Sequence, residues 1–203
     1  MSLSELLDPM FLISATGLFG VWAIVFAESG LFFGFFLPGD SLLFTAGLLA
    51  SQNFINIYGL YIGTAIAAIV GDNVGYYFGK RVGLAIFTKD DSLFFNKKNV
   101  ARAQLFYEEH GVKTIILARF IPIIRTFAPI VAGVGDMNYR KFFIYNCVGG
   151  ILWVVSMVSA GYVLGRVVPG IDKYILPIIF GIIILSFMPA IFHVMKNRKV
   201  KKV

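Results

Sequence analysis

Two arginines, Arg119 and Arg125, lie in an apolar stretch at 112–134 that also contains Pro122 and Pro129. Proline lacks an amide hydrogen and clashes with the preceding helical turn, so we expect the prolines to divide this stretch into pieces too short to cross a bilayer. A guanidinium group at bilayer depth costs at least about 2.5 kcal/mol, so each arginine must face protein, water or an anion. This segment is therefore the first candidate for a functional site.

The composition is typical of a membrane protein. Hydrophobic residues make up 58% of the 203 residues and charged residues only 14%, whereas about 25% of residues are charged in soluble domains. We predict an all-α polytopic membrane protein, a single membrane domain over 1–203 with about four spanning helices. The apolar runs long enough to span are 10–29, 55–79, 142–165 and 174–195.

Two further apolar segments, 30–50 and 114–134, are interrupted. Pro38 and Gly39 divide the first, and the two prolines divide the second. Each half has about 8–10 residues, roughly 15 Å of helix, which reaches only the middle of a bilayer. We therefore predict two re-entrant helical hairpins, which are tolerated where protein or a wet cavity satisfies the backbone.

The basic residues support the dip at 114–134. Seven lie in the loop 80–113 and five in the C-terminal tail 196–203, and short basic loops favour the cytoplasmic side. If the segment dips and returns, Arg140 and Lys141 stay on that side as well. We expect the C-terminus to be cytoplasmic and the basic loop and tail to contact anionic headgroups, so the net charge of +7 requires no nucleic acid.

The chain contains a weak internal repeat. A shift of 86 residues aligns several small residues at the hairpin ends and within the long apolar runs. Because the topology places the two copies in opposite orientations, we predict inverted halves at about 10–86 and 97–172, followed by a helix at 174–195. The aligned pairs are Ala46-Gly47 with Ala132-Gly133, Gly63 with Gly149, Gly75-Tyr76 with Gly161-Tyr162, and Gly79-Lys80 with Gly165-Arg166.

Three acids are candidates for proton coupling or gating: Glu28, Asp40 and Asp72. Each also has a simpler explanation. Asp40 follows Pro-Gly and is placed to cap the second half-helix, Glu28 can mark the end of the first helix, and Asp72 can be the partner of a buried arginine.

The arginines point to an anionic ligand. Guanidinium is always charged and binds phosphate oxygens in a bidentate way, and half-helix N-termini at the breaks would add positive dipole ends. We assign Arg119 and Arg125 to a substrate phosphate. The alternative is that they pair only with the three acids. We expect no metal site and no cofactor.

One set of motifs extends over roughly residues 20–165 and consists of Glu28, Pro38-Gly39-Asp40-Ser41, Gly71-Asp72, Tyr76, Gly79, Arg119-Phe120, Pro122, Arg125, Pro129, Ala132-Gly133, Phe142, Asn146, Gly149 and Trp153. Together these motifs resemble the DedA family of bacterial inner-membrane proteins. The resemblance implies a VTT-type domain with two re-entrant hairpins and membrane-lipid translocation, with undecaprenyl phosphate or phospholipids such as phosphatidylethanolamine as substrates. It also implies a link to the proton-motive force.

Our expectation is a lipid flippase that returns undecaprenyl phosphate to the cytoplasmic leaflet, coupled to protons. A phospholipid translocase or scramblase and a proton-coupled small-ion transporter remain alternatives, as does a membrane scaffold without transport. The loop at Pro38 also resembles that of undecaprenyl-pyrophosphate phosphatases, but Leu42 replaces the expected arginine and no Glu-x-x-x-Glu pair is present. We therefore expect no enzymatic activity. The oligomeric state stays open.

Overall fold

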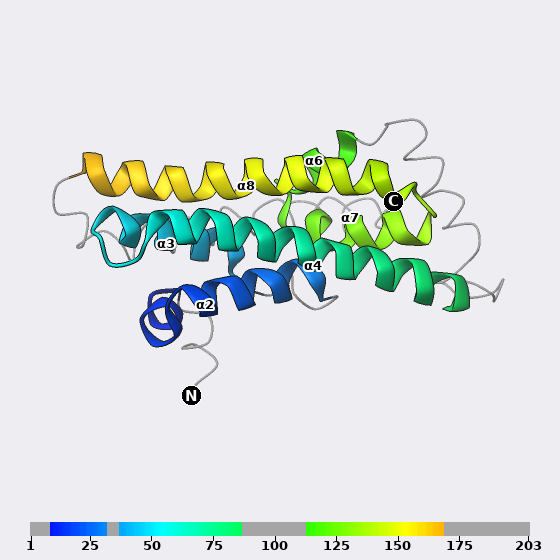
Figure 1. The fold of residues 1–203 in the computed structure, drawn as a ribbon, viewed down its shortest axis with the longest axis horizontal. Coiled ribbons are helices and arrows are strands. Elements are labelled where there is room, and N and C mark those ends of the chain that lie inside the picture. The colour runs from blue at the N-terminus through cyan, green and yellow to red at the C-terminus, as the bar shows by residue number, and fades with distance from the viewer. Residues whose placement is uncertain (1–8, 32–36, 87–112, 169–203) are drawn as a thin grey trace, which may run out of the picture.

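The computed structural model describes residues 9–31, 37–86 and 113–168. Within these ranges the chain is all-α, as predicted, and forms six helices without a strand (Figure 1). The predicted helix 174–195, the tail 196–203 and most of the basic loop lie outside the described residues. The helices are α2 (Pro9–Gly30), α3 (Gly39–Ser51), α4 (Ile57–Ile86), α6 (Lys113–Ala118), α7 (Pro122–Val134) and α8 (Tyr139–Val167).

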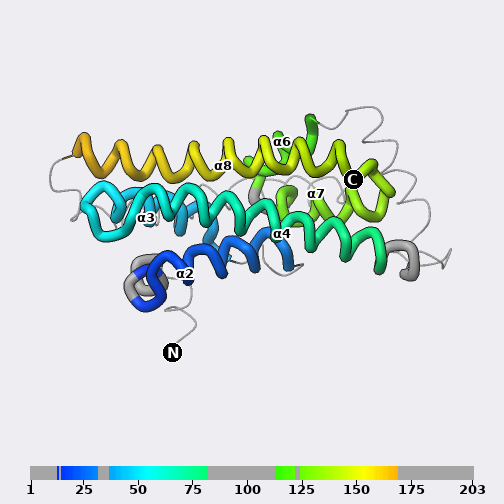
Figure 2. Tube along the Cα trace, viewed as in Figure 1, coloured from blue at the N-terminus to red at the C-terminus, as the bar shows by residue number. Residues whose placement is uncertain are grey.

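Helices α4 and α8 run along the length of the molecule (Figure 2). Both are long and apolar enough to cross a bilayer, which confirms helices of spanning length at 55–79 and 142–165. They are antiparallel, because residues later in α4 contact residues earlier in α8. Tyr61 hydrogen-bonds Ser159 at 2.7 Å, whereas the side-chain amide of Asn146 donates to the carbonyl of Ile69 at 3.1 Å.

Helix α2 forms over the predicted span 10–29 but is kinked. At Gly17 the backbone adopts φ 60° and ψ −150°, which is not helical, and which glycine tolerates because it lacks a Cβ. The apolar helix that contains and follows the kink covers Ala15–Gly30, about 24 Å at 1.5 Å per residue. The straight part of this helix is therefore shorter than the apolar run 10–29 suggests.

The helix in the segment 114–134 is interrupted just before Pro122, as predicted from the sequence. Helix α6 ends at Ala118 and α7 begins at Pro122, after an extended Ile121 with φ −114° and ψ 109°. The expectation that Pro129 also breaks the chain is wrong, since it lies inside the continuous helix α7. One proline removes a single i→i−4 hydrogen bond, and neighbouring helices support the rest of the helix.

Four of the aligned glycines lie where the short helices pack closely on the long helices. Each short helix packs on the long helix of the other half, α3 on α8 and α7 on α4. At these seams an added Cβ would collide with a backbone carbonyl, so only glycine allows the approach. The distances from such a Cβ are 2.2 Å for Gly47 to Val158, 2.0 Å for Gly161 to Phe44, 2.1 Å for Gly79 to Ile130 and 2.0 Å for Gly133 to Tyr76.

Two glycines one turn apart on α4 make a matched test of this packing. Gly79→Ala is expected to destabilise the protein by about 1–3 kcal/mol, because α4 and α7 must separate to admit a methyl group. At Gly75 the nearest atoms to an added Cβ are 3.5 Å away, in ordinary contact, so Gly75→Ala should be tolerated. Thermal unfolding in detergent measures both, and equal melting temperatures would contradict the packing argument.

Candidate functional site

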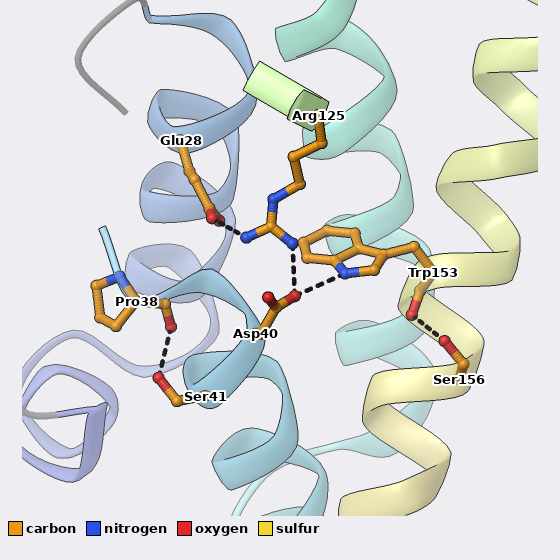
Figure 3. A network of polar contacts seen from close by, with 7 residues as sticks. All are labelled: Glu28, Pro38, Asp40, Ser41, Arg125, Trp153 and Ser156. Carbon is orange, nitrogen blue, oxygen red and sulfur yellow. Dashed lines mark hydrogen bonds and ion pairs between the residues drawn. The ribbon is translucent and has the colours of Figure 1, made fainter. Parts of the chain in front are cut away.

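Arg125 joins three helices through two carboxylates (Figure 3). From α7, its Nη1 donates to Oδ1 of Asp40 on α3 at 2.5 Å, and its Nη2 donates to Oε1 of Glu28 on α2. The Arg125 side chain is 8% exposed, that of Glu28 2% and that of Asp40 13%. Asp40 is thus the most accessible member of this group.

Arg119 forms the second centre, in the turn between α6 and α7. Its Nη1 donates to Oδ2 of Asp72 on α4 and, at 2.6 Å, to Oδ1 of Asn146 on α8. Arg119 and Asp72 are both almost fully buried. The break at Pro122 therefore places an arginine where the two long helices meet.

Trp153 connects the two centres from α8. Its indole N–H donates to Oδ1 of Asp40 at 2.8 Å, the oxygen that also accepts from Arg125 (Figure 3). The centre of its ring lies 4.6 Å from Cζ of Arg125 and 5.9 Å from Cζ of Arg119. Both distances fall within the range of cation–π attraction.

Some buried polar atoms of this cluster have no hydrogen-bond partner among the described residues. They are Nε and Nη2 of Arg119 and Oε2 of Glu28. A buried donor without an acceptor costs about 1–3 kcal/mol, more when the group is charged. The unpartnered nitrogens of Arg119 are therefore suited to an added acceptor, and phosphate oxygens are acceptors that guanidinium binds well.

The five predicted site residues lie in this one cluster. Of the simpler explanations for the three acids, the one for Asp72 is confirmed and those for Asp40 and Glu28 are wrong. Asp72 is indeed the partner of a buried arginine, as predicted. Asp40 does not cap α3, because the N-cap is Pro38 without a side-chain hydrogen bond, and Asp40 binds Arg125 and Trp153 instead. Glu28 is 1% exposed, so it is not a marker of a helix end at the membrane surface.

The predicted hairpin residues shape the cluster. A Cβ on Gly39 would lie 1.5 Å from Oε2 of Glu28, so a side chain at position 39 would displace the carboxylate. Pro38 accepts a hydrogen bond from the Ser41 hydroxyl at 3.0 Å at the start of α3. Gly133 belongs instead to the seam between α4 and α7.

Sequence reasoning assigned no role to Trp153 and Asn146 beyond their place in the family motif. A detectable signal was present: Asn146, Gly149, Gly150 and Trp153 follow an i, i+3, i+4, i+7 pattern, which places them on one face of a helix. The two glycines of this face lie against the turn that carries Arg119. A polar and an aromatic side chain flanking glycines on an apolar helix indicate a buried contact surface.

Other charged groups lie outside the cluster. Lys80 and Asp136 form an exposed ion pair at 2.8 Å between α4 and the turn before α8. Among the residues with described placement, no group of three His, Cys, Asp or Glu side chains is arranged to hold a metal ion.

Comparison with known proteins places this architecture in a family. The VTT domain model matches residues 37–163. Protein DedA of Escherichia coli is 44% identical over 189 residues, covering 89% of this chain and 86% of the relative. An uncharacterized membrane protein of Mycobacterium leprae is 44% identical over 196 residues, covering 94% and 87%. The inner membrane protein YqjA of Escherichia coli is 31% identical over 148 residues, covering 73% and 67%. No solved structure matches the chain. The chain therefore belongs to the DedA family of membrane proteins.

Proposed function

We propose that this protein moves a lipid phosphate across the bacterial inner membrane, returning undecaprenyl phosphate to the cytoplasmic leaflet. The observation that carries the proposal is the state of Arg119. It is buried, its charge is balanced by Asp72, and two of its three nitrogens have no partner among the described residues. A phosphate headgroup supplies the missing acceptors, and the prenyl tail stays in the hydrocarbon.

Arg125 joins in binding only after an exchange of partners. Its two terminal nitrogens already donate to Asp40 and Glu28, so a phosphate must displace at least one carboxylate to reach them. Asp40 is the more exposed of the two. We propose that the phosphate binds Arg119 first and then takes the place of Asp40 at Arg125.

The charge balance of the cluster favours coupling to protons. Two guanidinium groups face three carboxyl groups, Glu28, Asp40 and Asp72. A phosphate adds negative charge to a buried site, where such charge is costly unless it is compensated. We propose that Glu28 or Asp40 binds a proton as the phosphate enters. Glu28 has an oxygen without a donor, which suits it to carry that proton.

The short helices suggest how the site changes sides. Helices α3 and α7 have 13 residues each, about 20 Å and too short to cross a bilayer. We propose that they are the second arms of re-entrant hairpins in inverted halves, with the C-terminus in the cytoplasm. Alternating access then moves α3 with α8 against α7 with α4, since these pairs pack through close glycine seams.

The test uses purified protein in liposomes. It follows the loss of labelled undecaprenyl phosphate and of labelled phosphatidylethanolamine from one leaflet, for wild type and for Arg125→Ala. Movement of the polyprenyl phosphate that the substitution abolishes is the expected result. Movement of both lipids by wild type would identify a scramblase. Movement of neither, in folded protein, would overturn the proposal in favour of a small-ion transporter.

A further inference from the structure

Trp153 contacts the charged cluster in three ways. Its N–H donates to Asp40, and its ring lies within 6 Å of the guanidinium carbons of both Arg125 and Arg119. Trp153 is 1% exposed, so these contacts are shielded from water. A desolvated cation–π contact is stronger than an exposed one, so Trp153 is well placed to hold both arginines.

The ring differs from the carboxylate partners of the arginines in one respect. Glu28, Asp40 and Asp72 can lose their charge by taking up a proton or lose their contact when another anion enters. The indole ring carries no titratable group, so its attraction to a cation persists through both events. During the exchange of partners at Arg125, the ring is therefore the contact that does not have to break.

We propose that Trp153 is a positioning residue for substrate binding: its ring keeps Arg119 and Arg125 in place while carboxylates are exchanged for phosphate, and its N–H aligns Asp40 with Arg125. This inference rests on the proposed function. The competing explanation is that Trp153 only fills space, because it also packs in the hydrophobic core with Leu42, Leu43 and Val158.

Two substitutions separate these explanations. Trp153→Phe keeps an aromatic ring, whereas Trp153→Leu does not, and both remove the N–H and leave a smaller side chain. We expect the KM for the transported lipid phosphate to rise about tenfold or more in Trp153→Leu and less than about threefold in Trp153→Phe. The matched control is Val154→Ala, which leaves a cavity at the next buried position on α8 and should leave KM unchanged.

The comparison of KM values decides the inference. A KM at least about threefold higher in Trp153→Leu than in Trp153→Phe supports a positioning ring; a smaller difference between the two overturns it. Wild-type protein measured in parallel keeps the proposed function separate. If wild type moves no lipid phosphate, the proposed function is wrong. If wild type transports and the two variants have equal KM values, only the proposed role of Trp153 is wrong.

A direct binding measurement covers the case in which Trp153→Leu does not fold. The chain has two tryptophans, so Trp22→Phe leaves Trp153 as the only one. Titration with undecaprenyl phosphate should then change the tryptophan emission saturably, and undecaprenol, which lacks the phosphate, should not. No saturable change with a lipid phosphate that this variant transports would overturn the inference, because the bound headgroup would lie away from the ring.

Discussion

Arg125→Lys is expected to move lipid phosphate as poorly as Arg125→Ala, about 30-fold or more below wild type, the loss expected for one charge-assisted hydrogen bond. Arg125 reaches Asp40 with one nitrogen and Glu28 with another. Lysine keeps the positive charge but has a single nitrogen, which cannot reproduce this planar fork. The measurement is the initial rate of lipid movement in liposomes at equal protein content.

Stability has to be controlled in this comparison, because Arg125→Ala leaves Glu28 and Asp40 buried without their cation. The control is Arg125→Met combined with Glu28→Gln and Asp40→Asn, which removes all three charges together. We expect its melting temperature in detergent to exceed that of Arg125→Ala, while transport stays lost. If Arg125→Lys moved lipid at the wild-type rate, the argument that transport needs two separate nitrogens at this position would be wrong.

Much of this cluster is predictable from the sequence, because charge in an apolar chain is rare and costly. Arg119, Arg125 and the three acids stand out on that ground alone, and the structure brings all five together. The pairing of Asp72 with an arginine follows the same reasoning. The break before Pro122 is likewise a local property of proline, so no tertiary information was needed to predict it.

The errors arise where tertiary contacts override a local rule. Pro129 is a helix breaker by propensity, yet it lies within α7, which packs closely on α4. Asp40 has the sequence context of an N-cap, but Arg125 and Trp153 bind its carboxylate instead. These partners lie 85 and 113 residues away, so no local pattern could have identified them.

The repeat shows both the reach and the limit of sequence reasoning. The aligned glycines predict related halves, and the structure places several of them at equivalent seams. The sequence did not indicate that the seams join opposite halves, α3 with α8 and α7 with α4. Every contact of Arg125 and Arg119 with a carboxylate joins the two halves. The contact of Arg125 with Asp40 also joins α7 to α3, which belong to different moving pairs in the proposed alternating access, so that proposal links binding at Arg125 to the movement.

The second large effect is expected at Arg119, where substitution tests whether the arginine binds substrate or only balances Asp72. Arg119→Met leaves a buried carboxylate unpaired, which costs about 3–5 kcal/mol. Adding Asp72→Asn removes that charge, so the double variant should regain most of the lost stability in thermal unfolding. We expect it still to move no lipid phosphate, because the unpartnered nitrogens of Arg119 are gone.

Asp72→Asn alone is the informative counterpart, because it leaves the cation in place without its carboxylate. A phosphate can then supply the missing negative charge, so this variant should retain lipid binding while the double variant loses it. The opposite outcome is equally clear: a stable double variant that transports at the wild-type rate would make the Arg119–Asp72 pair purely structural. The phosphate would then have to bind at Arg125 alone, and the exchange with Asp40 would become its only route into the site.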